Sequence, residues 1–285
     1  MRLLRFRHGG ELHAGVLTDR GVAPVPEINA RRGTRVPNDL LEIIRSGTVE
    51  QLSETADVET IPWAAVEPQL PYATPPKIWC IGLNYASHAE DIQAVQPEEP
   101  GSFMKPASCM FAPGGEILLP PPEISNDVDA EGELGVIIGK TCRFVPAEHV
   151  QEVIFGYTTT LDLTALDVLR RNPRYLTRAK SIDTFFSFGP VIVTADETPE
   201  VEQLEVITEH NGGICSRDFV RNMKTKPLEL VRFHSDFMRL DPGDLISTGC
   251  PKGARIRPGD TIRARIDPIG VLAATVRQGE RRPLY

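Results

Sequence analysis

The 285-residue chain lacks the features that would place it in a membrane, an export pathway or a complex with nucleic acid. It has no uninterrupted run of about 18 apolar residues, roughly the length that a helix needs to cross a bilayer. Its first stretch, MRLLRFRHGGELHAG, turns polar before any apolar core of signal-peptide length, so we expect no export. A formal net charge of −8 without a basic cluster predicts no nucleic-acid partner.

Cysteine is scarce, and its distribution excludes two further classes of protein. The five cysteines are odd in number and scattered, and none stands in CxxC spacing; they are Cys80, Cys109, Cys142, Cys215 and Cys250. This pattern argues against a disulfide framework and against a zinc cluster. It suits a reducing compartment, so we expect the protein in the cytoplasm.

Proline and glycine are abundant, with 25 and 23 residues. They indicate many turns between short strands rather than long helices. We expect an α+β, predominantly β protein with a small N-terminal unit over residues 1–70 and a larger domain over 71–285. The boundary is marked by EPQLPYATPPKI, which has four prolines in twelve residues and reads as a linker.

Local signals locate several elements. Hairpin turns are expected at Gly9-Gly10 and at residues 19–21. PNDLLEIIRSG is typical of a short helix that starts at Asn38 or Asp39 and ends before Gly47. Further helices are expected in NYASHAEDIQAV and KPLELVRFHSDFM, and turns leading into strands in LDPGDLISTG and IRPGDTIRARI.

The segment DVDAEGELGVIIGK combines an apolar strand pattern with two carboxylates. Residues i and i+2 of a strand share one face, so Glu131 and Glu133 lie side by side and raise each other's pKa. The pair is either a solvent-exposed face or a site for a hard cation. Asp162 in GYTTTLDLTALD offers a third oxygen ligand, and an all-oxygen set favours Mg²⁺ or Mn²⁺, and Ca²⁺ less.

Six segments in order resemble the fumarylacetoacetate hydrolase superfamily over residues 72–276. They are KIWCIGLNYASHAED, FMKPASCMFAPGGEILLP, VDAEGELGVIIGK, GYTTTLDLTALD, KSIDTFFSFGP and LDPGDLISTGCPKG. The resemblance implies a mixed β-sheet roll, a homodimer, a small-molecule substrate and a divalent metal held by Glu131, Glu133 and Asp162. It also implies C–C bond cleavage in a 2-oxo acid or 1,3-dicarbonyl, such as an acylpyruvate, through a metal-stabilised enolate.

The same resemblance suggests catalytic residues. His88 matches a family histidine that activates water, and Asp91, three residues later, is the expected helical partner because such residues share a face. Lys180 matches a lysine that neutralises charge in the active site. Lys105 also resembles a recurring position, but we expect no catalytic role for it.

Substrate contacts are expected from TGCPKG, which is similar to a TGTPxG loop. Thr248 and Gly249 are retained, whereas Cys250 replaces the usual threonine. We interpret Cys250 as a small apolar side chain rather than a nucleophile, because no histidine neighbours it in sequence.

The departures from the family pattern concern the substrate carboxylate. Leu166 and Leu169 stand where relatives carry the arginine and glutamine that grip it, and Ser216 replaces another glutamine. Arg170 or Arg171 could substitute. Without the guanidinium this part of the pocket becomes apolar, which predicts a preference for a larger, less polar dicarbonyl over acylpyruvate or oxaloacetate.

Three functions remain open from the sequence. The first is a metal-dependent hydrolase or lyase of an acylpyruvate-like compound. The second keeps the metal and the enolate but uses no water, as in decarboxylation, isomerisation, tautomerisation or dehydration. The third is a non-catalytic member of the fold. The retained carboxylates, His88 and Lys180 disfavour the third, whereas the two leucines keep the second open.

Overall fold

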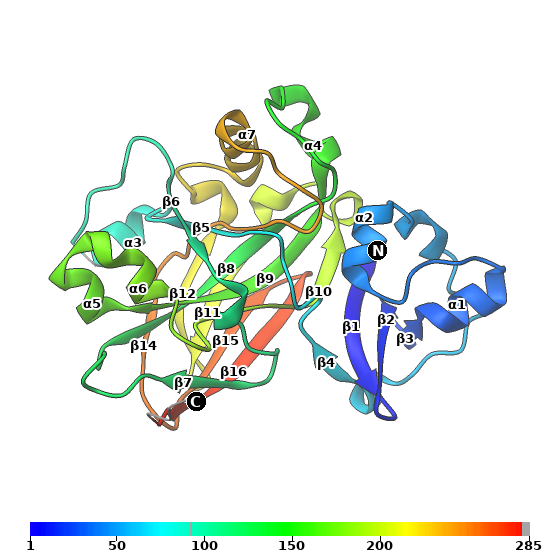
Figure 1. Ribbon diagram of the computed structural model, residues 1–285, viewed down its shortest axis with the longest axis horizontal. Coiled ribbons are helices and arrows are strands. Elements are labelled where there is room, and N and C mark those ends of the chain that lie inside the picture. Colours follow the sequence, from blue (N-terminus) through cyan, green and yellow to red (C-terminus); the bar gives the residue numbers. More distant parts are fainter. Residues whose placement is uncertain (92, 281–285) are drawn as a thin grey trace.

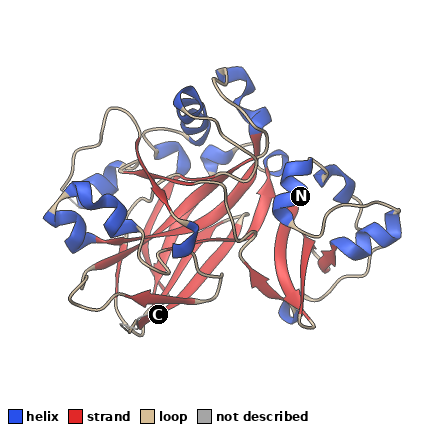
Figure 2. Cartoon of the chain, viewed as in Figure 1, coloured by secondary structure: helices blue, strands red, loops and turns tan. Residues whose placement is uncertain are grey.

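The computed structural model describes residues 1–91 and 93–280, arranged as two sheets with helices around them (Figure 1). Within this described part, no helix is long and apolar enough to cross a membrane. Strands outweigh helices, as Figure 2 shows, and the predicted α+β, predominantly β class is confirmed.

The N-terminal unit forms a three-stranded meander followed by two helices. The strands are β1 (Arg2–His8), β2 (Glu11–Thr18) and β3 (Gly21–Pro24), so both predicted hairpin turns are confirmed. Helix α1 spans Val25–Arg32 and α2 spans Leu40–Ser46. Asp39 caps α2 by accepting from the Glu42 amide, and Gly47 ends it with φ 64°, as predicted from the side-chain oxygen and the glycine.

The larger sheet crosses the predicted domain boundary. Its order is β3-β2-β1-β10-β9-β8-β13-β5-β6, with β14 beside β8 and β4 beside β1. The remaining strands of this sheet are β4 (Glu67–Gln69), β5 (Ile78–Gly82), β6 (Gly101–Lys105), β8 (Val128–Ile138), β9 (Ile154–Ala165), β10 (Phe186–Thr194), β13 (Leu245–Ser247) and β14 (Ala254–Ile256). It is mixed, since β13 runs parallel to β5 while β8 and β9 are antiparallel.

The second sheet has the order β12-β11-β15-β16-β7 and packs against β8 and β9. Its strands are β7 (Glu116–Leu119), β11 (Glu205–His210), β12 (Gly213–Phe219), β15 (Thr261–Ile266) and β16 (Gly270–Gln278). Gly132 allows this packing, because a Cβ there would lie only 2.7 Å from the Thr208 hydroxyl. The glycine between the two glutamates therefore faces the second sheet, and the glutamates face the opposite side.

The other helices are α3 (Ala86–Asp91), α4 (Val150–Val153), α5 (Leu166–Arg171), α6 (Leu176–Lys180) and α7 (Pro227–Phe237). Helix α7 confirms its prediction. Helix α3 is shorter than the segment predicted to be helical over 84–95, of which Ile92 lies outside the described residues. The strands predicted after the two Pro-Gly pairs are β13 and β15.

The boundary near residue 70 stays a prediction, and residues 281–285 of the predicted domain lie outside the described part. The linker segment contains β4, which pairs with β1, and its Tyr72 is buried against Phe188. One apolar cluster joins both sides of the boundary, with Leu3 and Leu40 packed in the same core as Phe188 and Leu245. The two units thus share a sheet and a core.

Candidate metal centre and active site

Three carboxylates meet on the buried face of β8 and β9. Glu131 and Glu133 alternate with Gly132 along β8, and Asp162 on β9 is the direct cross-strand partner of Glu131. Ligand atoms of all three lie within 4.8 Å of one another, and each residue is at most 4% exposed. The predicted metal ligands are therefore brought together, and the exposed-face alternative for the two glutamates is excluded.

Two lysines contact this cluster. Lys180, at the end of α6, donates to Glu131 Oε2 at 2.9 Å and to Asp162 Oδ2 at 2.7 Å. Lys105, at the end of β6, donates to Asp162 Oδ1 and to the Leu163 carbonyl. Formally, three carboxylates and two ammonium groups leave one uncompensated negative charge.

That charge falls on Glu133, which neither lysine contacts directly. Its Oε2 accepts from the Ser247 hydroxyl and from the Gly249 amide, the latter at 2.9 Å. Burial, reinforced by Asp162 and Glu131, nevertheless raises the pKa of Glu133 to about 8. Burial alone would also raise the pKa of Glu131, but Lys180 outweighs it and lowers that pKa.

The donor set fits a divalent cation. All ligands are carboxylate oxygens, the set that Mg²⁺ and Mn²⁺ prefer, and a cation would stabilise the ionised form of Glu133 that burial and the neighbouring carboxylates disfavour. A carboxylate oxygen has more than one lone pair, so contact with a lysine does not prevent it from binding an ion. Glu131, Glu133 and Asp162 would hold the cation.

His88 lies beside this cluster, but Asp91 is not its hydrogen-bond partner. His88 is 7% exposed, its Nδ1 has no hydrogen-bond partner, and burial lowers its pKa. Asp91 instead pairs with Lys252 Nζ at 2.9 Å. Helical spacing allows a shared face, but a free ammonium group nearby attracts the carboxylate more strongly than a neutral, buried imidazole.

In the loop predicted to bind substrate, Thr248 and Gly249 use their polar groups for hydrogen bonds within the protein. Thr248 is fully buried and its hydroxyl donates to the Leu134 carbonyl at 2.8 Å, while the Gly249 amide orients Glu133. Cys250 is 1% exposed, and burial raises the pKa of its thiol well above the ordinary value, which accords with a role other than nucleophile. Ser216 donates to the Lys252 carbonyl.

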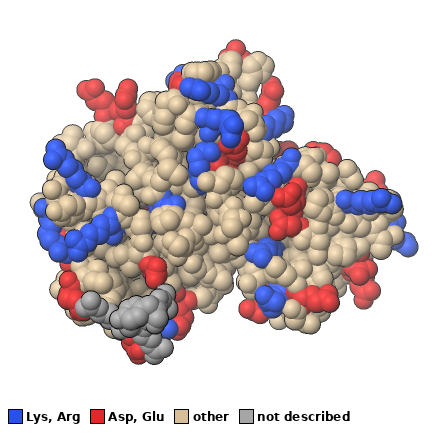
Figure 3. Space-filling model, in the orientation of Figure 1, with Lys and Arg blue, Asp and Glu red and all other residues tan. Residues whose placement is uncertain are grey.

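Leu166 begins α5 directly after the strand that carries Asp162, and Leu169 lies three residues further along the helix. Leu166 is 3% exposed, and half-buried Leu169 packs on an apolar cluster. Arg170 and Arg171, the two residues that could substitute for the family arginine, form ion pairs with acidic side chains outside the carboxylate cluster. Arg170 pairs with Asp127, and Arg171 pairs with Asp167 at 3.7 Å. Both are exposed, and Figure 3 shows basic side chains gathered over α5 and α6.

Comparison with known proteins identifies the family. Residues 77–277 match the profile described as "Fumarylacetoacetate (FAA) hydrolase C-terminal". Human oxaloacetate tautomerase FAHD2B, mitochondrial, is 32% identical over 95% of this chain and 90% of its own length. The chain belongs to the fumarylacetoacetate hydrolase family.

Solved structures agree with this assignment. Fumarylacetoacetate hydrolase from Exiguobacterium antarcticum superposes with a TM-score of 0.85 at 29% identity, covering 98% of this chain and all of that one. Maleylpyruvate hydrolase from Sphingobium sp. SYK-6, in complex with manganese(II) and pyruvate, has a TM-score of 0.79 at 30% identity, covering 98% of this chain and all of that one. A divalent-metal enzyme acting on a small molecule is the general class that these relatives support.

Sequence reasoning missed two side chains of the cluster and one contact. Lys105 resembles a recurring family position, but its contact with Asp162 is not predicted by the sequence. Ser247 donates to Glu133, and Thr164 donates to Glu131 Oε1 at 2.8 Å. Thr164 follows Asp162 by two residues, so strand alternation could have identified it. Lys105 and Ser247 come from other strands, and no local pattern marks their contacts.

Proposed function

We propose that the protein is a divalent-metal-dependent enzyme that interconverts the keto and enol forms of a 2-oxo acid or related 1,3-dicarbonyl without using water. The observation that carries the proposal is the buried cluster of three carboxylates with only two compensating lysines. A bound divalent cation would supply Lewis-acid charge to two neighbouring substrate oxygens. The human relative named an oxaloacetate tautomerase supports this reaction class over most of the chain.

The chain's own residues can carry the proton. Burial lowers the pKa of His88 and keeps it neutral, and its Nδ1 has no partner, so it can accept a proton from the carbon beside the carbonyl and deliver it to the enolate oxygen, and the reverse. Lys105 and Lys180 keep the carboxylates in place by contacting them from β6 and α6. The pairing of Asp91 with Lys252 leaves His88 without the acid that a water-activating pair would use, which favours tautomerisation over hydrolysis.

Hydrolytic C–C cleavage remains the second candidate. Its support is that His88, which lies within 4.8 Å of Glu131, could activate water, and that a relative is named a maleylpyruvate hydrolase. The apolar side chains of Leu166 and Leu169, in place of the arginine and glutamine of the family pattern, support an apolar substituent on the substrate in either case. We therefore propose that a dicarbonyl acid with an alkyl arm is preferred over oxaloacetate.

The reaction is tested with a matched pair of variants. The enol absorption of oxaloacetate and of a larger, alkyl-substituted 1,3-dicarbonyl acid is followed in parallel with chromatography of any cleavage products. His88→Ala should lower the tautomerisation rate by roughly two to four orders of magnitude. Asp91→Asn should leave most of it. Equal losses in both variants, together with two acid products, would instead establish the hydrolase.

The metal assignment is tested by stability as well as rate. Chelator should abolish turnover, and Mg²⁺ or Mn²⁺ should restore it and raise the melting temperature, because a ligand of the native state stabilises it. In Glu131→Gln the added ion should shift melting far less. An unchanged shift in that variant would contradict the assignment.

We also propose a homodimer in the cytoplasm. The family resemblance supports the dimer, and light scattering after gel filtration tests it. The scattered cysteines, which form no disulfide among the described residues, support the reducing compartment. The human relative is named mitochondrial, so fractionation of the source cells decides the location.

A further inference from the structure

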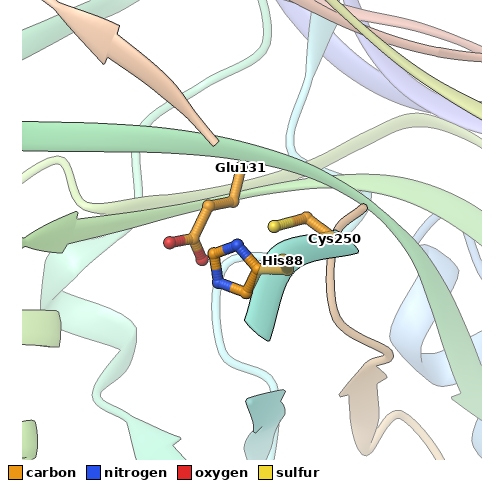
Figure 4. Close-up of side chains that lie close together, drawn as sticks. All are labelled: His88, Glu131 and Cys250. Atoms are coloured by element: carbon orange, nitrogen blue, oxygen red, sulfur yellow. The ribbon is translucent and has the colours of Figure 1, made fainter. Parts of the chain in front are cut away.

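A second cluster of potential ligands adjoins the three carboxylates. It consists of His88 on α3, Glu131 on β8 and Cys250 in the loop after β13, whose side chains point toward one another in Figure 4. Ligand atoms of the three lie within 4.8 Å of one another, and all three residues are buried. Glu131 belongs to both clusters.

The donors of this cluster differ in kind from the first. Nitrogen, sulfur and oxygen together suit a thiophilic cation such as Zn²⁺ or Cd²⁺ rather than Mg²⁺. Ligands of one tetrahedral zinc ion lie roughly 3–4 Å apart, given its bond lengths, so only small side-chain movements are needed. His88 provides an independent sign of a missing ligand, because its buried Nδ1 has no hydrogen-bond partner.

We propose that His88, Cys250 and Glu131 form a binding site for a thiophilic divalent cation, of the Zn²⁺ or Cd²⁺ type, that competes with the oxygen-bound cation for Glu131. Binding releases the thiol proton of Cys250 to solvent, and a sulfur–metal bond forms in its place. Glu131 is the residue that the two candidate sites share, and its oxygens already accept from Thr164 and Lys180. The site therefore makes the enzyme sensitive to soft metals because of one cysteine.

The test is a Cd²⁺ titration of metal-free protein, followed by the ultraviolet absorption of the cadmium–thiolate bond. The wild type should develop this band at one ion per chain. Cys250→Thr introduces the threonine that is usual in the TGTPxG loop of the family. This variant should lose the band and bind Cd²⁺ at least about tenfold more weakly. Cys215→Ser is the matched control: it removes a half-buried thiol outside the cluster and should leave the band unchanged.

Excess Mg²⁺ should raise the Cd²⁺ concentration at half-maximal absorption, because both ions need Glu131. Near-UV circular dichroism checks that Cys250→Thr is folded; if it is not, His88→Gln replaces it and should weaken Cd²⁺ binding while keeping a thiolate band. A full-strength, tight band in Cys250→Thr, or an affinity independent of Mg²⁺, would overturn the proposal. The titration requires no turnover, so its outcome does not depend on which reaction the enzyme catalyses.

Discussion

Lys105 shows how a single residue can determine the balance of charge in the site. Its ammonium group is fully buried between Asp162 and the Leu163 carbonyl, and it lies 5.8 Å from the centre of the Phe186 ring. Removing water from such a pair is costly, and only the partner charge offsets that cost. The same ammonium group repels any cation that the carboxylates bind. Stability and metal affinity should therefore respond to it in opposite directions.

Lys105→Met should destabilise the metal-free protein by about 3–5 kcal/mol, the usual effect of removing one member of a buried pair. It should also tighten Mg²⁺ or Mn²⁺ binding, because the site becomes more anionic. Urea unfolding and calorimetric titration measure the two effects. Lys77→Met breaks a pair with Asp244 just before β5 and β13, outside the carboxylate cluster, and should lower stability but leave metal affinity unchanged. Parallel changes in both variants would contradict the electrostatic argument.

For single residues, the sequence predicts contacts between residues that are close together along the chain. Glu131 and Glu133 share a face because side chains alternate along a strand, so their spacing of two residues is enough to predict that they lie close together. The Asp91–Lys252 pair could not be found in this way, since it joins residues far apart in sequence across the fold. The same holds for Lys105, whose contact with Asp162 depends on how β6 is placed against β9.

In helix α7, the start of the helix follows from the local sequence, whereas the burial of its His234 depends on tertiary packing. Pro227 starts it, and the Glu229 side chain accepts from the Lys226 amide, so both ends of the first turn are fixed by sequence. His234 is different. It is fully buried beside Trp79, and its Nδ1 lies 2.7 Å from the Leu230 carbonyl. We did not predict from the sequence that this histidine is part of the core.

Burial lowers the pKa of His234 below its ordinary value of 6.5, and no charged side chain contributes to that shift among the described residues. The unfolded chain therefore binds a proton below about pH 6.5 that the native state does not, so this histidine lowers stability as the pH falls through that value. His234→Gln should reduce the acid-side slope of the unfolding free energy between pH 7 and 5. His149→Gln, at an exposed site where Glu152 raises the pKa, should instead make that slope slightly steeper. Urea unfolding across the pH range measures both.

For the whole molecule, the important feature is that the N-terminal unit is built into the large sheet. Strand β1 pairs with β10, with Leu3 opposite Ile192, and the shared apolar core includes side chains from both units. The sequence indicated the unit from its hairpins and prolines, because these signals are local. It could not indicate that the unit continues the sheet, because pairing with β10 depends on side chains almost 190 positions away.

Deletion of residues 1–70 should therefore abolish cooperative unfolding of the remainder, since it exposes the core around Phe188 and Leu245. The control is the full chain cut at a protease site placed at Ala73–Thr74, which is exposed; this nicked protein should keep its melting transition. Calorimetry compares the two. A cooperative transition in residues 71–285 alone, close to that of the intact protein, would show that the predicted boundary separates independent domains.

The pairing of β1 with β10 also sets an order of events during synthesis. Leu3 leaves the ribosome 189 residues before Ile192, a delay of roughly 10–40 s at ordinary translation rates of about 5–20 residues per second. Strand β4 can join the Arg5–Arg7 part of the same edge of β1 early in synthesis, and β2 can join the opposite edge, but the Arg2–Leu4 part has no strand to join until β10 is made. Nascent chains therefore carry a short open strand edge that includes Leu3 and Leu4 for most of their synthesis, and this stage is where a chaperone that binds such edges would act.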